Sequence, residues 1–195
     1  MKKRNLLLLF SGLSLLLAGC SASSMNDDGM KSQSGGMMMQ GQAPFGDADS
    51  IAYSRELWSA LERVRLVGPS AKPDRVYTGT HPHGAMLENL SDSVTVRGHE
   101  GEVIVKRNYG GPGITADKVA ADRKAWLKAV TVMFKREKGY DTEDQDWFWV
   151  KYKPDGSLFA NPKGMRLAGR VAKGMPMGCI ACHKAAPGGD MLYTR

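Results

Sequence analysis

Residues 101–107 read GEVIVKR and are the best candidate for a β-strand in this 195-residue chain. The run Val-Ile-Val favours a strand, because branched side chains are stiff in a helix and pack well on a pleated surface. A glycine-rich loop, NYGGPG at 108–113, follows directly and ends the strand. The segment therefore predicts one strand of a β-sheet.

Other strand-like segments lie on both sides of this one. Residues 93–96 (SVTV) and 130–135 (VTVMFK) alternate, and residues 147–152 (WFWVKY) alternate with aromatic side chains on both faces. The last two are separated by an acidic, turn-rich loop and predict an antiparallel hairpin. The aromatic residues indicate that 147–152 is a central strand rather than an edge strand.

Helical segments alternate with these strands. Apolar residues recur with helical spacing over 53–64, and Asp47 and its neighbours can cap a helix that is expected to stop at Gly68. Thr115 can cap a second helix over 116–129. Strands and helices in this order predict an α+β fold, in which helices flank an antiparallel β-sheet.

Near the C-terminus, the segment Cys179-Ile180-Ala181-Cys182-His183 has the CxxCH pattern by which haem c is attached. Cys179 and Cys182 would form thioether bonds to one haem, and His183 would ligate its iron. A redox dithiol would be expected early in a βαβ unit, and a zinc site needs two more ligands at similar spacing. The pattern therefore predicts one covalent haem c and a C-terminal attachment segment.

Residues 1–19 predict a lipoprotein signal peptide. A basic start (KKR, 2–4) precedes an apolar run over 6–17, which is too short for a membrane span of about 20 residues. LAGC at 17–20 resembles the lipobox of bacterial lipoproteins, so Cys20 is expected to carry lipid and anchor the chain to a membrane. The serine after Cys20 resembles the signal for the periplasmic side of the outer membrane in a Gram-negative bacterium.

The remaining sequence divides in two. Residues 20–46, rich in Met, Gly and Ser, predict a flexible tether, although soft methionine thioethers could also bind Cu(I). Residues 47–195 are then one haem c domain, and the lipid and haem assignments leave no cysteine for a disulfide. The formal charge of +7 falls to +4 without Lys2, Lys3 and Arg4, and no clustered basic stripe indicates a nucleic-acid partner.

Ordered motifs over residues 74–195 resemble the cytochrome P-460 family, which includes the related cytochromes c′-beta. These motifs are HPHGAM, GHEGEVIVKRNYG, DWFWVKYKPDG and the tail GCIACHKAAPGGDMLYTR. The resemblance implies redox chemistry or binding of small nitrogen species, such as hydroxylamine or nitric oxide, at a haem iron. A non-catalytic gas-binding or electron-transfer protein is the alternative, so enzymatic activity stays open. A redox partner protein is expected if the chain is active, and the related families make a homodimer a candidate assembly.

The same resemblance selects residues around the haem. In cytochromes P-460 the lysine at the position of Lys106 is bonded to a meso carbon of the porphyrin, whereas an exposed strand-end lysine is the common alternative. Members that oxidise hydroxylamine use a distal carboxylate, but Thr131 falls at or beside that position and cannot act as a base. Met133 and Phe134 are candidates for the distal pocket, or they are core residues.

The other histidines are His81, His83 and His99. They could belong to a loop or to the start of a strand, one of them could be a sixth haem ligand, or they could hold a separate metal ion. No carboxylate pattern accompanies them, and the alternatives stay open at the level of sequence.

Overall fold

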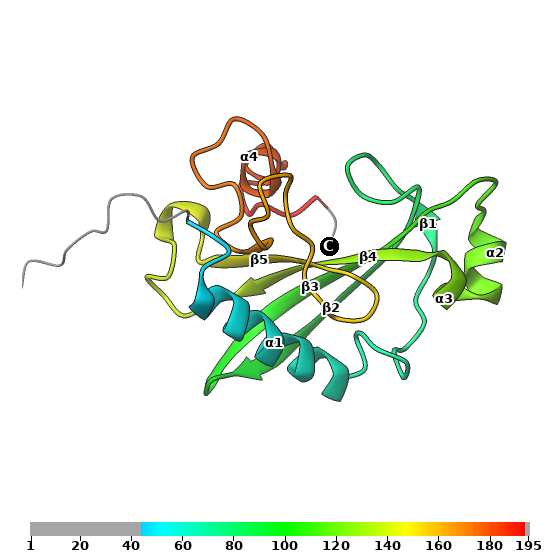
Figure 1. Cartoon of the computed structure of the whole chain (residues 1–195), viewed down its shortest axis with the longest axis horizontal. Helices are drawn as coiled ribbons and strands as arrows, with labels where there is room; N and C mark the ends of the chain where they lie inside the picture. Colours follow the sequence, from blue (N-terminus) through cyan, green and yellow to red (C-terminus); the bar gives the residue numbers. More distant parts are fainter. Residues whose placement is uncertain (1–43, 194–195) are drawn as a thin grey trace, which may run out of the picture. The chain divides into compact units, whose positions relative to one another are not determined.

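The computed structural model describes residues 44–193, which form an antiparallel sheet of six strands in the order β1-β2-β3-β4-β5-β6 (Figure 1). The strands are β1 (Tyr77–Thr78), β2 (Met86–Val96), β3 (His99–Tyr109), β4 (Leu127–Lys135), β5 (Trp147–Tyr152) and β6 (Ala168–Gly169). Every neighbouring pair is antiparallel, so the predicted α+β class is confirmed.

The helices of the described residues are short apart from the first. They are α1 (Ala48–Arg63), α2 (Ala116–Ala121), α3 (Arg123–Trp126), the 3₁₀ turn η1 (Thr142–Asp144) and α4 (Cys179–His183). Within residues 44–193, no helix has the length and apolar character needed to cross a membrane. The predicted signal peptide, Cys20 and most of the predicted tether lie outside the described residues.

The predicted strand at 101–107 is the middle of β3, which pairs with all eleven residues of β2. The prediction for β2 was too short, because it covered only 93–96 of Met86–Val96. The first half of β2 contains polar residues, among them Glu88, which is fully buried. Arg107 on β3 is also buried and forms an ion pair with this carboxylate. The pairing allows the polar first half of β2 to be part of the sheet.

The helices differ from the sequence prediction in where the first one ends and in how the second one is divided. Asp47 caps α1 as expected, but the helix ends at Arg63 rather than near Gly68, because Arg65 has a positive φ of 62°. The single helix predicted over 116–129 is wrong. It breaks at Asp122, whose side chain accepts from the Ala125 amide and starts α3, and Leu127 already pairs with β3.

The sheet has two differently covered faces, because successive side chains of a strand point to opposite sides. On one face, α1 packs over the buried core through Tyr53, Leu57 and Leu61, and its position below the sheet is visible in Figure 1. The other face carries a second cluster, which includes Trp149 and Ile180 of α4. We call this second face the site face.

The edges of the domain differ from the sequence prediction. Phe45 is buried in the cluster of the site face and bridges to Gly169, so the tether predicted over 20–46 ends too late.

β5 pairs fully with β4 but has only the two residues of β6 on its other side. The strand is therefore next to the edge of the sheet rather than central, and the prediction holds only in part.

Candidate functional site

The short helix α4 lies on the site face and carries the CxxCH segment. Ile180 is buried against the cluster that contains Trp149, whereas the thiols of Cys179 and Cys182 are free. Residues three apart lie on one side of a helix, so the two thiols share a side of α4. Gly178 precedes the helix with φ 131°, and a Cβ there would collide with Ala172. The chain therefore needs glycine at this position to enter α4.

His183 is the buried end of this segment, with 7% of its surface exposed. Its Nδ1 lies 2.7 Å from the carbonyl oxygen of Met191, which can only accept, so Nδ1 carries the hydrogen and Nε2 keeps its lone pair. Burial lowers the pKa of His183, and Lys106 nearby lowers it further. A neutral imidazole whose tautomer is fixed by a backbone carbonyl is the usual form of a metal-ligating histidine.

One row of paired residues crosses the site face. Asn89 of β2 pairs with Lys106 of β3, Lys106 pairs with Thr131 of β4, and Thr131 pairs with Lys151 of β5. Side chains of directly paired residues point to the same side of a sheet, so this row holds two lysines and no carboxylate. The site face therefore offers positive charge and no acid in this row.

Lys106 is buried in the middle of that row, with 9% of its surface exposed. The alternative of an exposed strand-end lysine is wrong. Among residues 44–193, its ammonium group makes no hydrogen bond and no ion pair. Burial lowers the pKa of Lys106, an effect that the thiol of Cys182 partly offsets. A lysine that is largely buried without a salt-bridge partner contributes little to stability through its charge, which indicates a role other than stabilising the fold.

His83, in the loop before β2, is the second histidine of the site face. Its Nδ1 lies 3.0 Å from Oδ1 of Asn108 and 3.4 Å from the hydroxyl of Thr131. Its ring centre is 6.3 Å from that of His183. Burial, together with the nearby charge of Lys106, lowers the pKa of His83 to about 4, so the ring is neutral at pH 7.

Of the two candidates for the distal pocket in β4, only one lies on the site face. Phe134 is fully buried on the opposite face, where it contacts Tyr53 of α1, so its prediction as a distal residue is wrong. Met133, its neighbour in β4, does lie in the cluster of the site face with Ile180. Neighbouring residues of one strand point to opposite faces, so Met133 and Phe134 could not both line one pocket.

Of the three alternatives left open for the histidines, a separate metal site that they share is wrong. His81 is exposed, and His99 binds the carbonyl of Lys135 at the far end of β3 from Asn108 and His83. Within the described part of the chain, no group of three His, Cys, Asp or Glu side chains is arranged to hold a metal ion.

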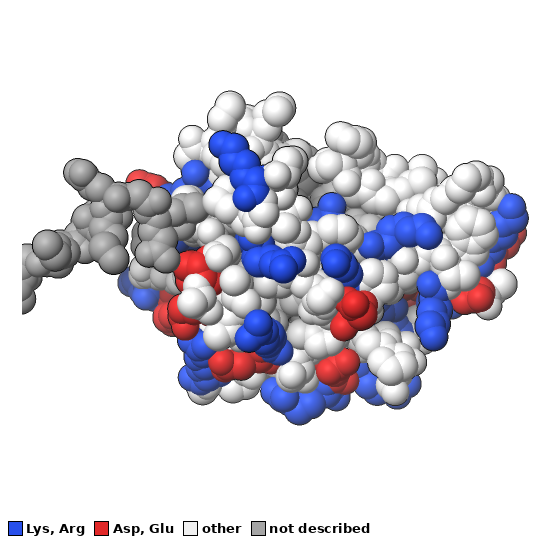
Figure 2. Space-filling model, in the orientation of Figure 1, with Lys and Arg blue, Asp and Glu red and all other residues white. Residues whose placement is uncertain are grey.

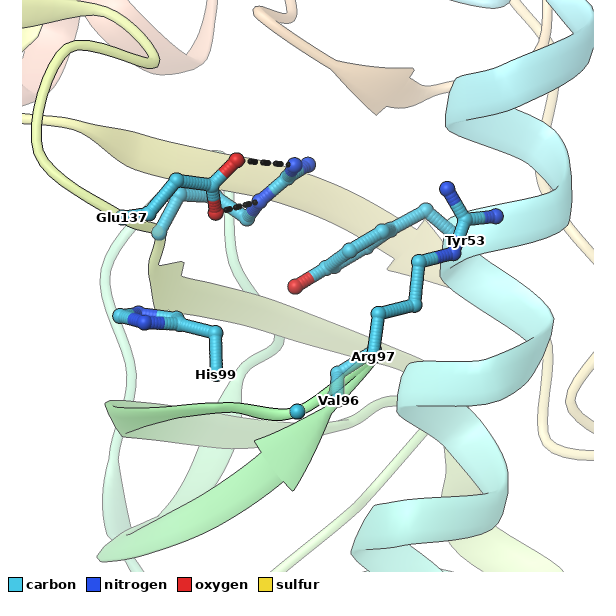
Figure 3. A pocket seen from close by; sticks show the side chains of 7 residues that line it. Tyr53, Val96, Arg97, His99 and Glu137 are labelled. Atoms are coloured by element: carbon cyan, nitrogen blue, oxygen red, sulfur yellow. Dashed lines mark hydrogen bonds and ion pairs between the residues drawn. The ribbon is translucent and has the colours of Figure 1, made fainter.

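Figure 3 shows a pocket at the turn between β2 and β3. This turn lies at the other end of β3 from Asn108 of the site face. Its charged groups are paired: Arg136 binds Glu137 through two hydrogen bonds of 2.6 and 2.7 Å, and Arg97 binds Glu56. Arg136 also stacks on Tyr53 at 3.8 Å. Arg97 thus joins the β2–β3 turn to α1, and Arg136 joins the end of β4 to α1. Because these charged groups are paired, we assign the pocket a structural role.

Three residues of the site were missed by the sequence prediction. Asn108, Trp149 and Lys151 lie on the site face, where Trp149 is 4.8 Å from the His183 ring. The alternation of a strand could have found Asn108, because it lies two residues after Lys106 and therefore points to the same side. By the same alternation, Lys151 points to the same side of the sheet as Trp149.

Together these features define a class: an α+β domain whose antiparallel sheet carries, on one face, a C-terminal Cys-x-x-Cys-His helix with a metal-ready histidine. The family model described as Cytochrome P460 matches residues 77–194, and the chain belongs to this family. Membership implies a haem cofactor. No curated protein and no solved structure matches the chain.

The residues of the site fit a haem. His183 presents a free Nε2, and the two thiols lie on one side of the adjacent helical turn. Met133 and Trp149 supply an apolar wall, and Nε1 of Trp149 is buried without a partner among the described residues. The other lysine of the row, Lys151, suits a negative propionate group of a haem.

Proposed function

We propose that this chain is a lipid-anchored, exported mono-haem c protein that binds small nitrogen species, such as nitric oxide, at a haem iron and carries out slow redox chemistry on them. The observation that carries the proposal is the joint placement of His183, the two thiols and Lys106 on the site face. The haem, when bound, supplies a redox-active iron that coordinates small ligands.

The protein's residues divide the remaining tasks. Cys179 and Cys182 would hold the haem through thioether bonds, and His183 would ligate its iron from the side of α4. The carbonyl of Met191 keeps the His183 ring in one orientation, and Trp149 packs against that ring. These contacts support a single geometry of the histidine.

The distal side favours binding over efficient oxidation of hydroxylamine. Removing protons from an amine requires a positioned base, which is worth about 10²–10⁴-fold in rate. The row Asn89, Lys106, Thr131 and Lys151 contains no carboxylate, and Thr131 instead accepts a hydrogen bond from Asn108 at 3.2 Å. The lack of a carboxylate in this row supports the alternative of a gas-binding or electron-transfer role.

We expect the ferrous haem-loaded protein to bind nitric oxide to saturation at one molecule per haem, but to oxidise hydroxylamine only slowly. Absorption titration and turnover with an artificial electron acceptor measure the two properties. The variant Thr131→Glu returns a carboxylate to the row and should raise hydroxylamine turnover by about 10²-fold. Rapid turnover by the wild type, unchanged in Thr131→Glu, would contradict the proposal.

Lys106 is proposed to bond through Nζ to a meso carbon of the haem, as the resemblance to cytochromes P-460 implies. The bond would form as Nζ and the meso carbon each lose one hydrogen, with an external peroxide as the two-electron oxidant that is reduced to water. Its burial and its position in the row beside Thr131 support this role. We expect the ferrous wild type to show a red-shifted Soret band and Lys106→Met to show an ordinary haem c spectrum. Lys128→Met, which removes an exposed lysine of β4, is the matched control and should keep the wild-type spectrum. Identical ordinary spectra in the wild type and in Lys106→Met would exclude the bond.

The anchoring and the domain organisation belong to the same proposal. A signal peptide over 1–19, lipid on Cys20 and a tether up to the start of the fold would place the haem domain at the periplasmic side of the outer membrane. Haem c is attached outside the cytoplasm in bacteria, which agrees with this location. Figure 2 shows basic and acidic side chains interspersed on the visible face, without a continuous basic stripe. A redox partner protein and a homodimer complete the proposal.

A further inference from the structure

His83 and His183 reach the site face from distant parts of the sequence. His83 lies in the loop before β2, and His183 ends α4. Their ring centres are 6.3 Å apart and their ring planes are inclined at 85°. Such proximity of two imidazoles is informative only if the free nitrogen of each ring is known.

The hydrogen-bond network around Asn108 assigns the tautomer of His83. Nδ2 of Asn108 donates to the carbonyl oxygens of Lys106 at 2.9 Å and Ala129 at 3.3 Å, so the amide orientation is fixed. Oδ1 of Asn108 must therefore accept, and the His83 Nδ1 that lies 3.0 Å from it carries the hydrogen. The lone pair of His83 is left on Nε2.

His183 has the same arrangement, with Nδ1 donating to the carbonyl of Met191 and Nε2 free. In both rings Nδ1 donates to an amide oxygen and Nε2 is free, which is the usual arrangement of a histidine that ligates a metal. Two imidazoles whose Nε2 atoms point at one ion from opposite sides have ring centres about 6–6.5 Å apart, since a metal–nitrogen bond is about 2.0–2.1 Å and the ring centre lies roughly 1.1 Å from the nitrogen. The observed separation of 6.3 Å lies within this range.

We propose that His83 is a sixth, displaceable ligand of the haem iron that His183 ligates, so that a small molecule must displace His83 to bind. The inference rests on the proposed function and adds a means of regulating its site. The support from Asn108 and Thr131 holds the His83 ring on the site face, and no comparable contact holds His81, which is exposed.

The test is the spin state of the ferric haem in the full-length, haem-loaded protein, measured by absorption and electron paramagnetic resonance. The variants are His83→Ala and His83→Gln, and His81→Ala is the control from the same loop. We expect low-spin haem in the wild type and in His81→Ala, and high-spin haem in both His83 variants. Added imidazole should restore the low-spin signal of His83→Ala, because it can take the position at the iron that the variant leaves open.

Carbon monoxide provides a second readout. Carbon monoxide can bind only to iron that His83 has left, so its apparent Kd equals the intrinsic Kd divided by the fraction of iron without His83. The variant His83→Ala should therefore bind carbon monoxide at least about tenfold more tightly than the wild type. High-spin haem in the wild type, or low-spin haem that persists in both His83 variants, would overturn the inference and leave the proposed function intact. A wild type without haem would overturn the proposed function and the inference together.

Discussion

The double variant Cys179→Ser, Cys182→Ser, made in the Lys106→Met background so that Lys106 cannot hold the haem either, is expected to lose all covalently bound haem. A serine hydroxyl cannot form the thioether bond, and residues 44–193 contain no other cysteine that could replace the two thiols. Cells that carry the maturation machinery for haem c should produce the wild type with haem that survives denaturing electrophoresis and the double variant without it. Haem staining of the gel measures the difference.

The control for this experiment is Ala181→Ser, which changes the residue between the two cysteines and leaves both thiols in place. It should retain the full haem stain. Single variants at Cys179 or Cys182 should keep one thioether bond and an intermediate yield. Equal staining of the double variant and the wild type would show that the haem is attached elsewhere.

Glu88→Gln is expected to lower the free energy of unfolding by about 3–5 kcal/mol, because it removes one partner of a buried ion pair. The carboxylate is fully buried, and it accepts from Arg107 at 2.8 Å, from the hydroxyl of Tyr109 at 2.6 Å and from Arg123 at 2.7 Å. A neutral amide would leave Arg107 buried without a compensating charge. Urea unfolding of the haem-loaded protein at pH 7 measures the loss, and exposed Glu102→Gln should change stability by less than about 0.5 kcal/mol.

The pH dependence of stability tests the same carboxylate. Burial alone would raise the pKa of Glu88, but the hydrogen bonds from Tyr109 and Arg123, the Asp74 amide and the charge of Arg107 lower it below its ordinary value of 4.5. The folded state therefore gains stability from ionised Glu88 above pH 4.5 and loses it as the pH falls through the lowered pKa. Glu88→Gln should weaken this acid-dependent loss. An equally steep loss in both proteins would assign it to other carboxylates.

The parts of the fold that the sequence predicted are those set by local pattern. β3 and β5 are rich in β-branched and aromatic residues, and α1 has a capping Asp47 and a regular apolar face. The start of β2 was not predictable in this way, because Glu88 becomes compatible with a buried strand only through Arg107 and Arg123, which lie far along the chain. The break between α2 and α3 likewise depends on the pairing of β4 with β3, which is a long-range contact.

The residues of the candidate site also differ in whether a local pattern or a long-range contact determines their position. The CxxCH segment is local and was found directly, whereas the contact of His83 with Asn108 joins a loop to a strand 25 residues away and leaves no local pattern. The error at Phe134 had a different cause. Strand alternation places it on the face opposite to Lys106 and Thr131, and the register of β3 with β4 makes this assignment definite.

The central claim is that one haem is bound covalently to the CxxCH helix on the site face. The most direct measurement is the intact mass of the wild-type protein, made with the haem c maturation machinery and extracted with acidified organic solvent, followed by mass spectrometry of its peptides. We predict a mass increase of one haem that survives extraction and maps to the peptide containing Cys179 and Cys182. A chain that has the mass of the polypeptide alone after extraction, or a haem that is absent from the peptide containing Cys179 and Cys182, would contradict the claim.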